Sequence, residues 1–290
     1  PTVCWSLEKE SKVLNLFDSF YGQSEVPIEI TLPNGDGPFP VIITQHGSTR
    51  DGQIFVGKKG QTDEHSRRLT ERAVTRGFAV IALDAFYNKN LQPTDKRKFP
   101  NAETYAKEIR NQIATLNPKL DPKLTFYTGH SYGGAAVINA IFENDVDKWT
   151  ALVSAEPHCN TFPSPRKLDV PILIIKGGES HYTPEPCAIL QNLYEEKRTS
   201  IELKIFPKSD HYFSYNGKVS NTGVAFNGCS KDPILIYGTN IFKRVDGTKL
   251  KRRDLLKCFT QQSAGGKKTR EDLDEVIDIT ISFFEEHLRN

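Results

Sequence analysis

A serine flanked by glycines is the first residue of this sequence that could do chemistry. Gly129-His130-Ser131-Tyr132-Gly133 has the form G-x-S-x-G. Residues 124–128 before it are β-branched and aromatic, as in a strand, and residues 135–142 after it are small and apolar, as in a buried helix. A serine on such a sharp strand-to-helix turn, the nucleophile elbow, exposes its hydroxyl. The pattern predicts Ser131 as a nucleophile; the alternative is an ordinary loop between strand and helix.

His211 is the histidine best placed to activate this serine. A serine hydroxyl attacks efficiently only when a base takes its proton, and histidine titrates in the useful range. His211 follows the strand-like residues 201–206 by a short loop, so we expect it at the carboxyl edge of a sheet, where the elbow also lies. It also follows Ser131 in the chain, as the order serine, acid, histidine requires. The sequence predicts His211 as the general base.

Two backbone N–H groups are expected to form an oxyanion hole. Acyl transfer develops negative charge on the carbonyl oxygen, and preorganised donors stabilise it. The N–H of Tyr132 directly follows the nucleophile, and Ser48 ends the segment Gln45-His46-Gly47-Ser48 after the strand-like residues 41–44. We predict Tyr132 and Ser48 as the two donors. We expect His46 to orient this loop by hydrogen bonding rather than to transfer protons.

Alternating strands and helices must position these residues. Residues 33–38 read as a hairpin-like turn cluster, and Asp121-Pro122 as a turn before the elbow strand. The strand-to-helix alternation predicts an α/β fold, with a mostly parallel central sheet and helices on both faces. The strands are expected at 26–32, 41–44, 78–83, 124–128, 150–153, 171–175 and 201–206, and the helices at 66–76, 102–116, 135–142, 184–197 and 272–288.

The region 212–268 interrupts this alternation. It is rich in Gly, Asn, Lys and Ser and has one strand-like run, Ile234–Tyr237. We expect a single domain over 1–290, with this region as an insertion packed near the site. A basic cluster within it is expected to be solvated surface, although it could also attract an anionic substrate or polymer. The cluster comprises Lys243, Arg244, Lys249, Lys251, Arg252, Arg253 and Lys257.

Composition limits the classes of partner. The chain has 290 residues, 37% hydrophobic and 26% charged, which is typical of a soluble globular protein with a substantial core. Its formal net charge of +2 predicts no strong attraction to nucleic acid or to an anionic membrane. No apolar run reaches the length of a membrane-spanning helix. We expect a small-molecule partner, with no nucleic acid and no membrane.

The five cysteines predict neither a zinc site nor a disulfide-dependent scaffold. None of Cys4, Cys159, Cys187, Cys229 and Cys258 has the paired spacing of zinc ligands, so no metal or other cofactor is expected. Free, mostly buried thiols are the default expectation. If disulfides form, the pairs expected are Cys159–Cys187 and Cys229–Cys258. The compartment is weakly constrained, with periplasmic or secreted favoured over cytoplasmic.

In these motifs the chain resembles the α/β-hydrolase superfamily and, more narrowly, the dienelactone hydrolase family. The resemblance runs from about residue 40 to 290 and is most specific over 77–86, 121–134, 171–187 and 209–213. It implies an eight-stranded fold, a catalytic triad and hydrolysis of ester or lactone bonds without a metal. Dienelactone hydrolases proper use a cysteine nucleophile. Ser131 therefore favours a serine esterase.

The acid of the triad is the part of the family pattern that this chain lacks. The family places an aspartate where this sequence has Ser180, which cannot carry the charge that stabilises an imidazolium. Glu156-Pro157 follows the strand-like residues 150–153 and resembles the Asp-Pro pair of pancreatic-type lipases. Glu156 is therefore the first candidate, Glu179 the second, and Glu185 a remote third. The alternative for Glu156 is a solvated loop carboxylate.

These residues together predict a serine hydrolase that cleaves carboxylic ester or lactone bonds through an acyl-enzyme at Ser131. A scaffold protein with a decayed triad, motivated by Ser180, and an acyltransferase are the alternatives. Aromatic residues near the strand ends are expected either to line an acyl or alcohol pocket or to belong to the core. They are Phe86, Tyr87, Tyr132, Tyr182, Tyr212 and Phe213.

Overall fold

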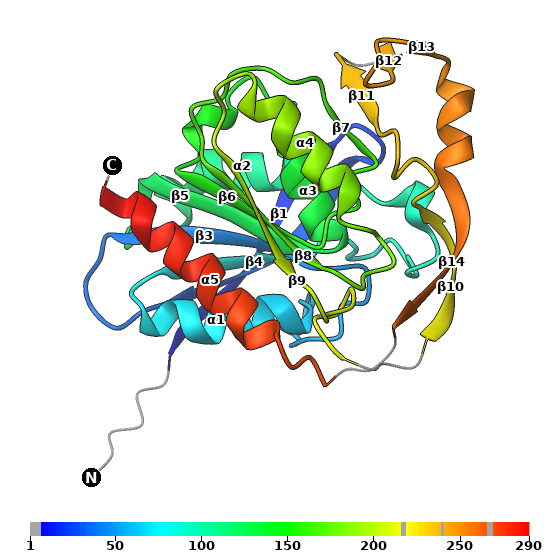
Figure 1. Cartoon of the computed structure of the whole chain (residues 1–290). Helices are drawn as coiled ribbons and strands as arrows, with labels where there is room; N and C mark the ends of the chain where they lie inside the picture. The colour runs from blue at the N-terminus through cyan, green and yellow to red at the C-terminus, as the bar shows by residue number, and fades with distance from the viewer. Residues whose placement is uncertain (1–6, 216–218, 239–240, 266–268, 290) are drawn as a thin grey trace.

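A central sheet of eight strands organises the chain (Figure 1). The computed structural model describes residues 7–215, 219–238, 241–265 and 269–289. The strand order is β1-β2-β4-β3-β5-β6-β8-β9, antiparallel between β1, β2 and β4 and parallel from β4 to β9. The strands are β1 (Glu8–Asp18), β2 (Gly22–Leu32), β3 (Phe39–Gln45), β4 (Ala79–Leu83), β5 (Leu120–His130), β6 (Ala151–Ala155), β8 (Ile172–Gly177) and β9 (Ile201–Phe206).

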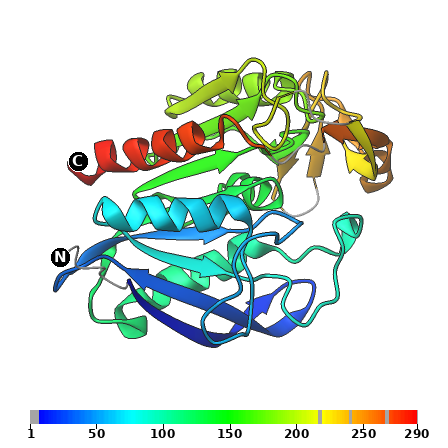
Figure 2. The same ribbon diagram turned by 90° about the horizontal axis from the view of Figure 1, so that it is seen from below.

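Helices cover both faces of this sheet, as the side chains of its strands require. In β3, Val41 and Ile43 pack into one hydrophobic cluster and Ile42 into another, because successive side chains of a strand point to opposite faces. The first cluster includes α2 (Ala102–Leu116), α3 (Tyr132–Ala140) and α4 (Glu185–Glu195), and the second includes α1 (Glu64–Thr75) and α5 (Leu273–Glu286). Figure 2 shows α1 and α5 running side by side over the sheet.

The predicted α/β-hydrolase fold, with a mostly parallel sheet of about eight strands and helices on both faces, is confirmed. Several local predictions were wrong. Residues 33–38 do not close a hairpin, because β2 pairs with β1 and β4 while β3 pairs with β4 and β5. Asp121-Pro122 lies within β5, where the pairing with β3 shifts register. Helix α3 begins at Tyr132, directly after the serine, and not at residue 135.

Two small sheets lie at one side of the main sheet, and all their strands except β7 come from the segment between β9 and α5 (Figure 1). β10 (Val219–Phe226) pairs with β14 (Phe259–Gly265). The second sheet has the order β13-β12-β11-β7. Its strand β7 (Thr161–Pro163) lies between β6 and β8 in the chain and pairs with β11 (Ile234–Tyr237). The remaining short elements are β12 (Ile241–Lys243), β13 (Lys249–Leu250), η1 (Lys96–Lys98), η2 (Val146–Lys148), η3 (Arg252–Cys258) and η4 (His287–Arg289).

Disulfides join the cysteines of the described chain in two pairs. Cys159 is bonded to Cys187 and Cys229 to Cys258. The default expectation of free thiols was therefore wrong for these four residues, and Cys4 lies outside the described residues. The first bond ties the loop after β6 to the first turn of α4, and the second joins the loop after β10 to the last residue of η3. Within the described ranges, no helix has the length and apolar character needed to cross a membrane.

Candidate active site

Ser131 lies on a strained turn between β5 and α3. Its φ of 57° and ψ of −110° are unusual for a residue with a side chain, and such strain is concentrated at functional sites. Its N–H donates to the carbonyl oxygen of Ala155 at 2.9 Å. A Cβ at Gly134 would lie 2.2 Å from that same oxygen, and one at Gly133 would lie 2.2 Å from the carbonyl oxygen of Gln45. The turn therefore needs glycine at both positions so that α3 can approach β3 and β6.

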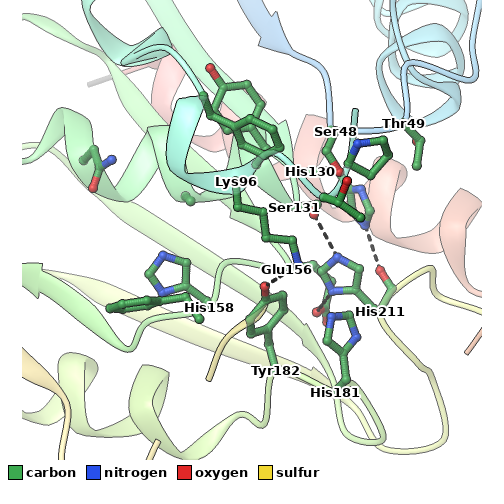
Figure 3. Close-up of a pocket in the computed structure, with 18 of the residues that line it drawn as sticks. Ser48, Thr49, Lys96, His130, Ser131, Glu156, His158, His181, Tyr182 and His211 are labelled. Carbon is green, nitrogen blue, oxygen red and sulfur yellow. Dashed lines mark hydrogen bonds and ion pairs between the residues drawn. The ribbon is translucent and has the colours of Figure 1, made fainter. Parts of the chain in front are cut away.

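A continuous chain of hydrogen bonds connects Ser131, His211 and Glu156 (Figure 3). The distance from Ser131 Oγ to His211 Nε2 is 2.9 Å, and His211 Nδ1 lies 2.8 Å from Glu156 Oε2. His211 and Glu156 are buried, with 4% and 1% of their surfaces exposed. Ser131 and Glu156 directly follow β5 and β6, and His211 lies in the loop after β9, so all three meet at the carboxyl edge of the sheet, as expected for an open parallel sheet.

Glu156 is held by donors from the end of β8 as well as by His211. Its Oε2 accepts from Lys176 Nζ at 2.8 Å and from Ser180 Oγ at 2.7 Å, and its Oε1 accepts the N–H of Gly177. Glu156 itself has a φ of 55°, so its backbone is strained like that of Ser131. Ser180, at the position of the family's aspartate, therefore contacts the carboxylate as a hydrogen-bond donor.

The structure does not bring Glu179, the second candidate acid, to His211. Its side chain is exposed, while its backbone N–H donates to the carbonyl oxygen of Ser209 at 2.9 Å. Glu185 is likewise exposed, in the first turn of α4. Glu179 lies in the turn after β8 and is exposed, whereas the next residue, Ser180, is buried.

Burial keeps the histidines around Ser131 neutral. The pKa of His211 is lowered well below its usual value, first by burial and then by the neighbouring His130 and by Lys176. Burial also lowers the pKa of His130 and of His158 to about 4, and that of His181 to about 2. A neutral imidazole is the form that accepts a proton from a serine, so His211 is in the state needed by a general base.

The predicted oxyanion donors Tyr132 and Ser48 line the same pocket as Ser131. Tyr132 is the first residue of α3, so its N–H has no acceptor within the helix. Figure 3 draws both Ser48 and Ser131 among the residues that line this pocket. The loop before Ser48 is fixed, because Gly47 N–H donates to Asp63 Oδ2 at 2.5 Å. His46 accepts the N–H of Ala85 at 3.0 Å through Nε2. His46 thus contacts backbone, in agreement with an orienting role.

The site opens into a pocket of about 810 Å³, which is large enough for a drug-sized molecule. Lys96 reaches into it from η1 and donates to the hydroxyl of Tyr182 at 3.2 Å (Figure 3). Phe86 and Phe213 instead belong to the core, and Tyr87 is not among the residues that line the pocket. The aromatic residues that line it are Phe99, Tyr132, Tyr182, Tyr212, Phe226 and Phe259.

Sequence reasoning missed Lys96, His158, His181 and Lys176. The first three lie on loops or short elements whose course no periodicity predicts. The sequence does contain a sign of Lys176, because this lysine directly follows the apolar run Ile172–Ile175. The strand continues through Lys176 to Gly177, and all its residues are buried. Among the described residues, no group of three or more histidine, cysteine or carboxylate side chains could hold a metal ion.

Comparisons with known proteins agree with this fold. No curated protein sequence matches the chain. Among solved structures, a candidate dienelactone hydrolase from Klebsiella pneumoniae subsp. pneumoniae MGH 78578 has a TM-score of 0.54 at 17% identity, covering 71% of this chain and 88% of its own. Thermogutta terrifontis esterase 2 has a TM-score of 0.50 at 16% identity, covering 71% and 86%. At these identities the likeness shows a shared fold.

A Pyrococcus horikoshii acylaminoacyl peptidase shares the fold over part of its length. Its TM-score is 0.53 at 14% identity, and the match covers 71% of this chain but 38% of the peptidase. The model of the dienelactone hydrolase family matches residues 53–225, which is more than half of the chain and includes Ser131, Glu156 and His211. This protein therefore belongs to the dienelactone hydrolase family.

Proposed function

We propose that this protein is a serine hydrolase that cleaves carboxylic ester or lactone bonds through an acyl-enzyme at Ser131. The observation that carries the proposal is the hydrogen-bond chain from Ser131 Oγ through His211 to Glu156, at 2.9 Å and 2.8 Å. Family membership supports a hydrolase, and the fold is shared with the esterase of Thermogutta terrifontis.

In the first half-reaction, Ser131 Oγ attacks the ester carbonyl carbon while His211 Nε2 takes the hydroxyl proton. The carbonyl oxygen becomes an oxyanion, held by the N–H groups of Tyr132 and Ser48. Glu156 stabilises the imidazolium through Nδ1–H. The imidazolium then gives its proton to the leaving alkoxide, which departs as an alcohol and leaves an acyl group on Ser131.

In the second half-reaction, His211 takes a proton from a water molecule, and the resulting hydroxide attacks the acyl carbon. Collapse of the second tetrahedral intermediate breaks the bond to Ser131 Oγ, which recovers its proton from His211. The products are a carboxylic acid and an alcohol, or one hydroxy acid when the substrate is a lactone. No step needs a metal or an organic cofactor.

The alternative of a scaffold protein with a decayed triad was motivated by Ser180. In the structure, the carboxylate of Glu156 lies at Nδ1 of His211, and Ser180 donates to that carboxylate. This arrangement supports the enzyme over the scaffold. The two disulfides support our proposal of a periplasmic or secreted location, since such bonds persist in oxidising compartments.

Labelling with a fluorophosphonate tests the proposal. We expect one equivalent to attach at Ser131, with loss of turnover of p-nitrophenyl esters, and no labelling of Ser131→Ala. Wild-type protein is then assayed with acyl chains of increasing length, and a burst of p-nitrophenol equal to the enzyme concentration would report the acyl-enzyme. An unlabelled Ser131 in folded protein, or full turnover by Ser131→Ala, would overturn the proposed function.

A further inference from the structure

Lys176 is a fully buried cation next to the catalytic residues. It lies in β8 with its side chain wholly inaccessible, and its Nζ donates to Glu156 Oε2 at 2.8 Å and to the carbonyl oxygen of Pro157 at 3.0 Å. Burying an ammonium group is costly unless it is paired. Burial accordingly lowers the pKa of Lys176, and the charge of Glu156 opposes that change.

Lys176 and His211 share one oxygen atom. Glu156 Oε2 lies 2.8 Å from Lys176 Nζ and 2.8 Å from His211 Nδ1. The two nitrogens are therefore at most twice that distance apart, or about 5.6 Å. At this separation two positive charges repel strongly even in a partly polarisable interior. Lys176 thus does two things at once: it fixes the carboxylate, and it opposes protonation of the imidazole.

The other groups around His211 do not cancel this repulsion. His181, Tyr182 and Tyr212 have their ring centroids 4.5, 5.5 and 5.4 Å from that of His211, and His130 lies at 5.2 Å. Two further cations act on the imidazole from neighbouring elements, Lys96 from η1 and Arg270 from the segment before α5. Glu156 is the carboxylate in contact with the ring, and Lys176 already offsets its charge.

We propose that Lys176 is a positioning residue that holds Glu156 against His211 and keeps His211 unprotonated at acidic pH, so that the hydrolase stays active there. This inference rests on His211 acting as the base in the proposed function. In a triad without such a cation, the carboxylate alone faces the imidazole and favours its protonated form. Here the Glu156–Lys176 pair is neutral overall, and the imidazolium receives less stabilisation.

The pH dependence of kcat/KM for p-nitrophenyl acetate tests this role. In Lys176→Met the acid limb should move upward by roughly one to two pH units, because a positive charge at most about 5.6 Å from His211 Nδ1 is lost. Lys176→Arg keeps the charge and should leave the acid limb near that of the wild type. Lys204→Met, on the exposed side of the adjacent strand β9, is the matched control and should leave it unchanged.

A purely structural role would lower kcat without moving the acid limb. An acid limb in folded Lys176→Met that stays in place or moves downward would overturn the inference. Titration of His211 by NMR in the wild type provides a readout independent of turnover and of whether Lys176→Met folds. We expect a midpoint below 6.5, and a midpoint at or above 6.5 would also overturn the inference. Failure of Ser131 to react with the fluorophosphonate, with the His211 titration as expected, would instead contradict the proposed function.

Discussion

Replacing Glu156 with glutamine should separate the charge of the candidate acid from its shape. The amide fills nearly the same volume, but it carries no negative charge and offers only one acceptor oxygen. Glu156 Oε2 accepts hydrogen bonds from Lys176, Ser180 and His211. A neutral amide oxygen would accept these three hydrogen bonds more weakly than the carboxylate does. The imidazolium formed when Ser131 attacks would lose its counter-charge, and the ground state would change far less.

The size of the loss follows from the distance between the two groups. A carboxylate 2.8 Å from His211 Nδ1 stabilises a unit positive charge by about 6 kcal/mol at an effective dielectric constant of about 20. Each 1.36 kcal/mol corresponds to tenfold in rate, so kcat should fall by about 10⁴-fold. Replacing the triad aspartate of a serine protease with asparagine has an effect of similar size, about 10⁴-fold.

The assay compares kcat and KM of wild type, Glu156→Gln and Glu179→Gln with p-nitrophenyl butyrate at 20 °C and pH 7.5. Glu179 is exposed, so Glu179→Gln should stay within about twofold of the wild type. Glu156→Gln also leaves Lys176 without its charged partner, which should cost about 3 to 5 kcal/mol of stability. Circular dichroism at the assay temperature must therefore show folded protein.

The assignment of Glu156 as the acid would be refuted if folded Glu156→Gln kept a tenth or more of wild-type kcat. It would equally be refuted if Glu179→Gln lost as much activity as Glu156→Gln, because the distance to His211 would then not be what matters.

Two more predictions concern the pocket wall and the free energy of unfolding at acidic pH. Replacing Cys229 and Cys258 with serine should lower kcat/KM about tenfold for p-nitrophenyl decanoate but less than twofold for p-nitrophenyl acetate. The reason is that the disulfide anchors Phe259, which follows Cys258, at the pocket wall. Equal losses for both esters would argue against this role of the disulfide. His65 is buried, and its pKa in the folded protein is lowered to about 3. Below pH 6.5 His65 therefore binds a proton in the unfolded state but not in the folded state, which favours unfolding. Between pH 6.5 and 4.5 this difference should lower the free energy of unfolding by about 2 to 3 kcal/mol. Urea unfolding at both pH values, with His65→Phe as a variant that cannot be protonated, measures this loss; an identical loss in that variant would contradict the assignment.

Much of the main sheet could be predicted because its strands are buried runs between clear turn signals. The run 78–83 and the helix 102–116 differ from the observed elements by no more than one residue. β1 was missed because it is an edge strand whose first residues, Glu8 to Lys12, are charged or polar and at least partly exposed. Its pairing partner β2 does contain a run of buried residues, which β1 lacks.

The site was predictable where chain order determines position, and less so where side chains meet across strands. Ser131 and His211 follow strands whose ends share one edge, so their proximity follows from parallel topology. The choice between Glu156 and Glu179 depends on which side chain turns inward. That direction follows from the φ of 55° at Glu156 and from donors at the end of β8 and just after it, which no local pattern reveals.

In this chain the carboxylate beside His211 follows β6, and a serine stands after β8, where the family has its aspartate. This difference matters when inactive relatives are identified from sequence. Ser180 and Glu156 are joined by a 2.7 Å hydrogen bond, so carboxylates starting from either strand end converge on the same space beside His211. A chain classified only by the residue after β8 would be counted among proteins without an acid, although its neighbouring strand supplies one.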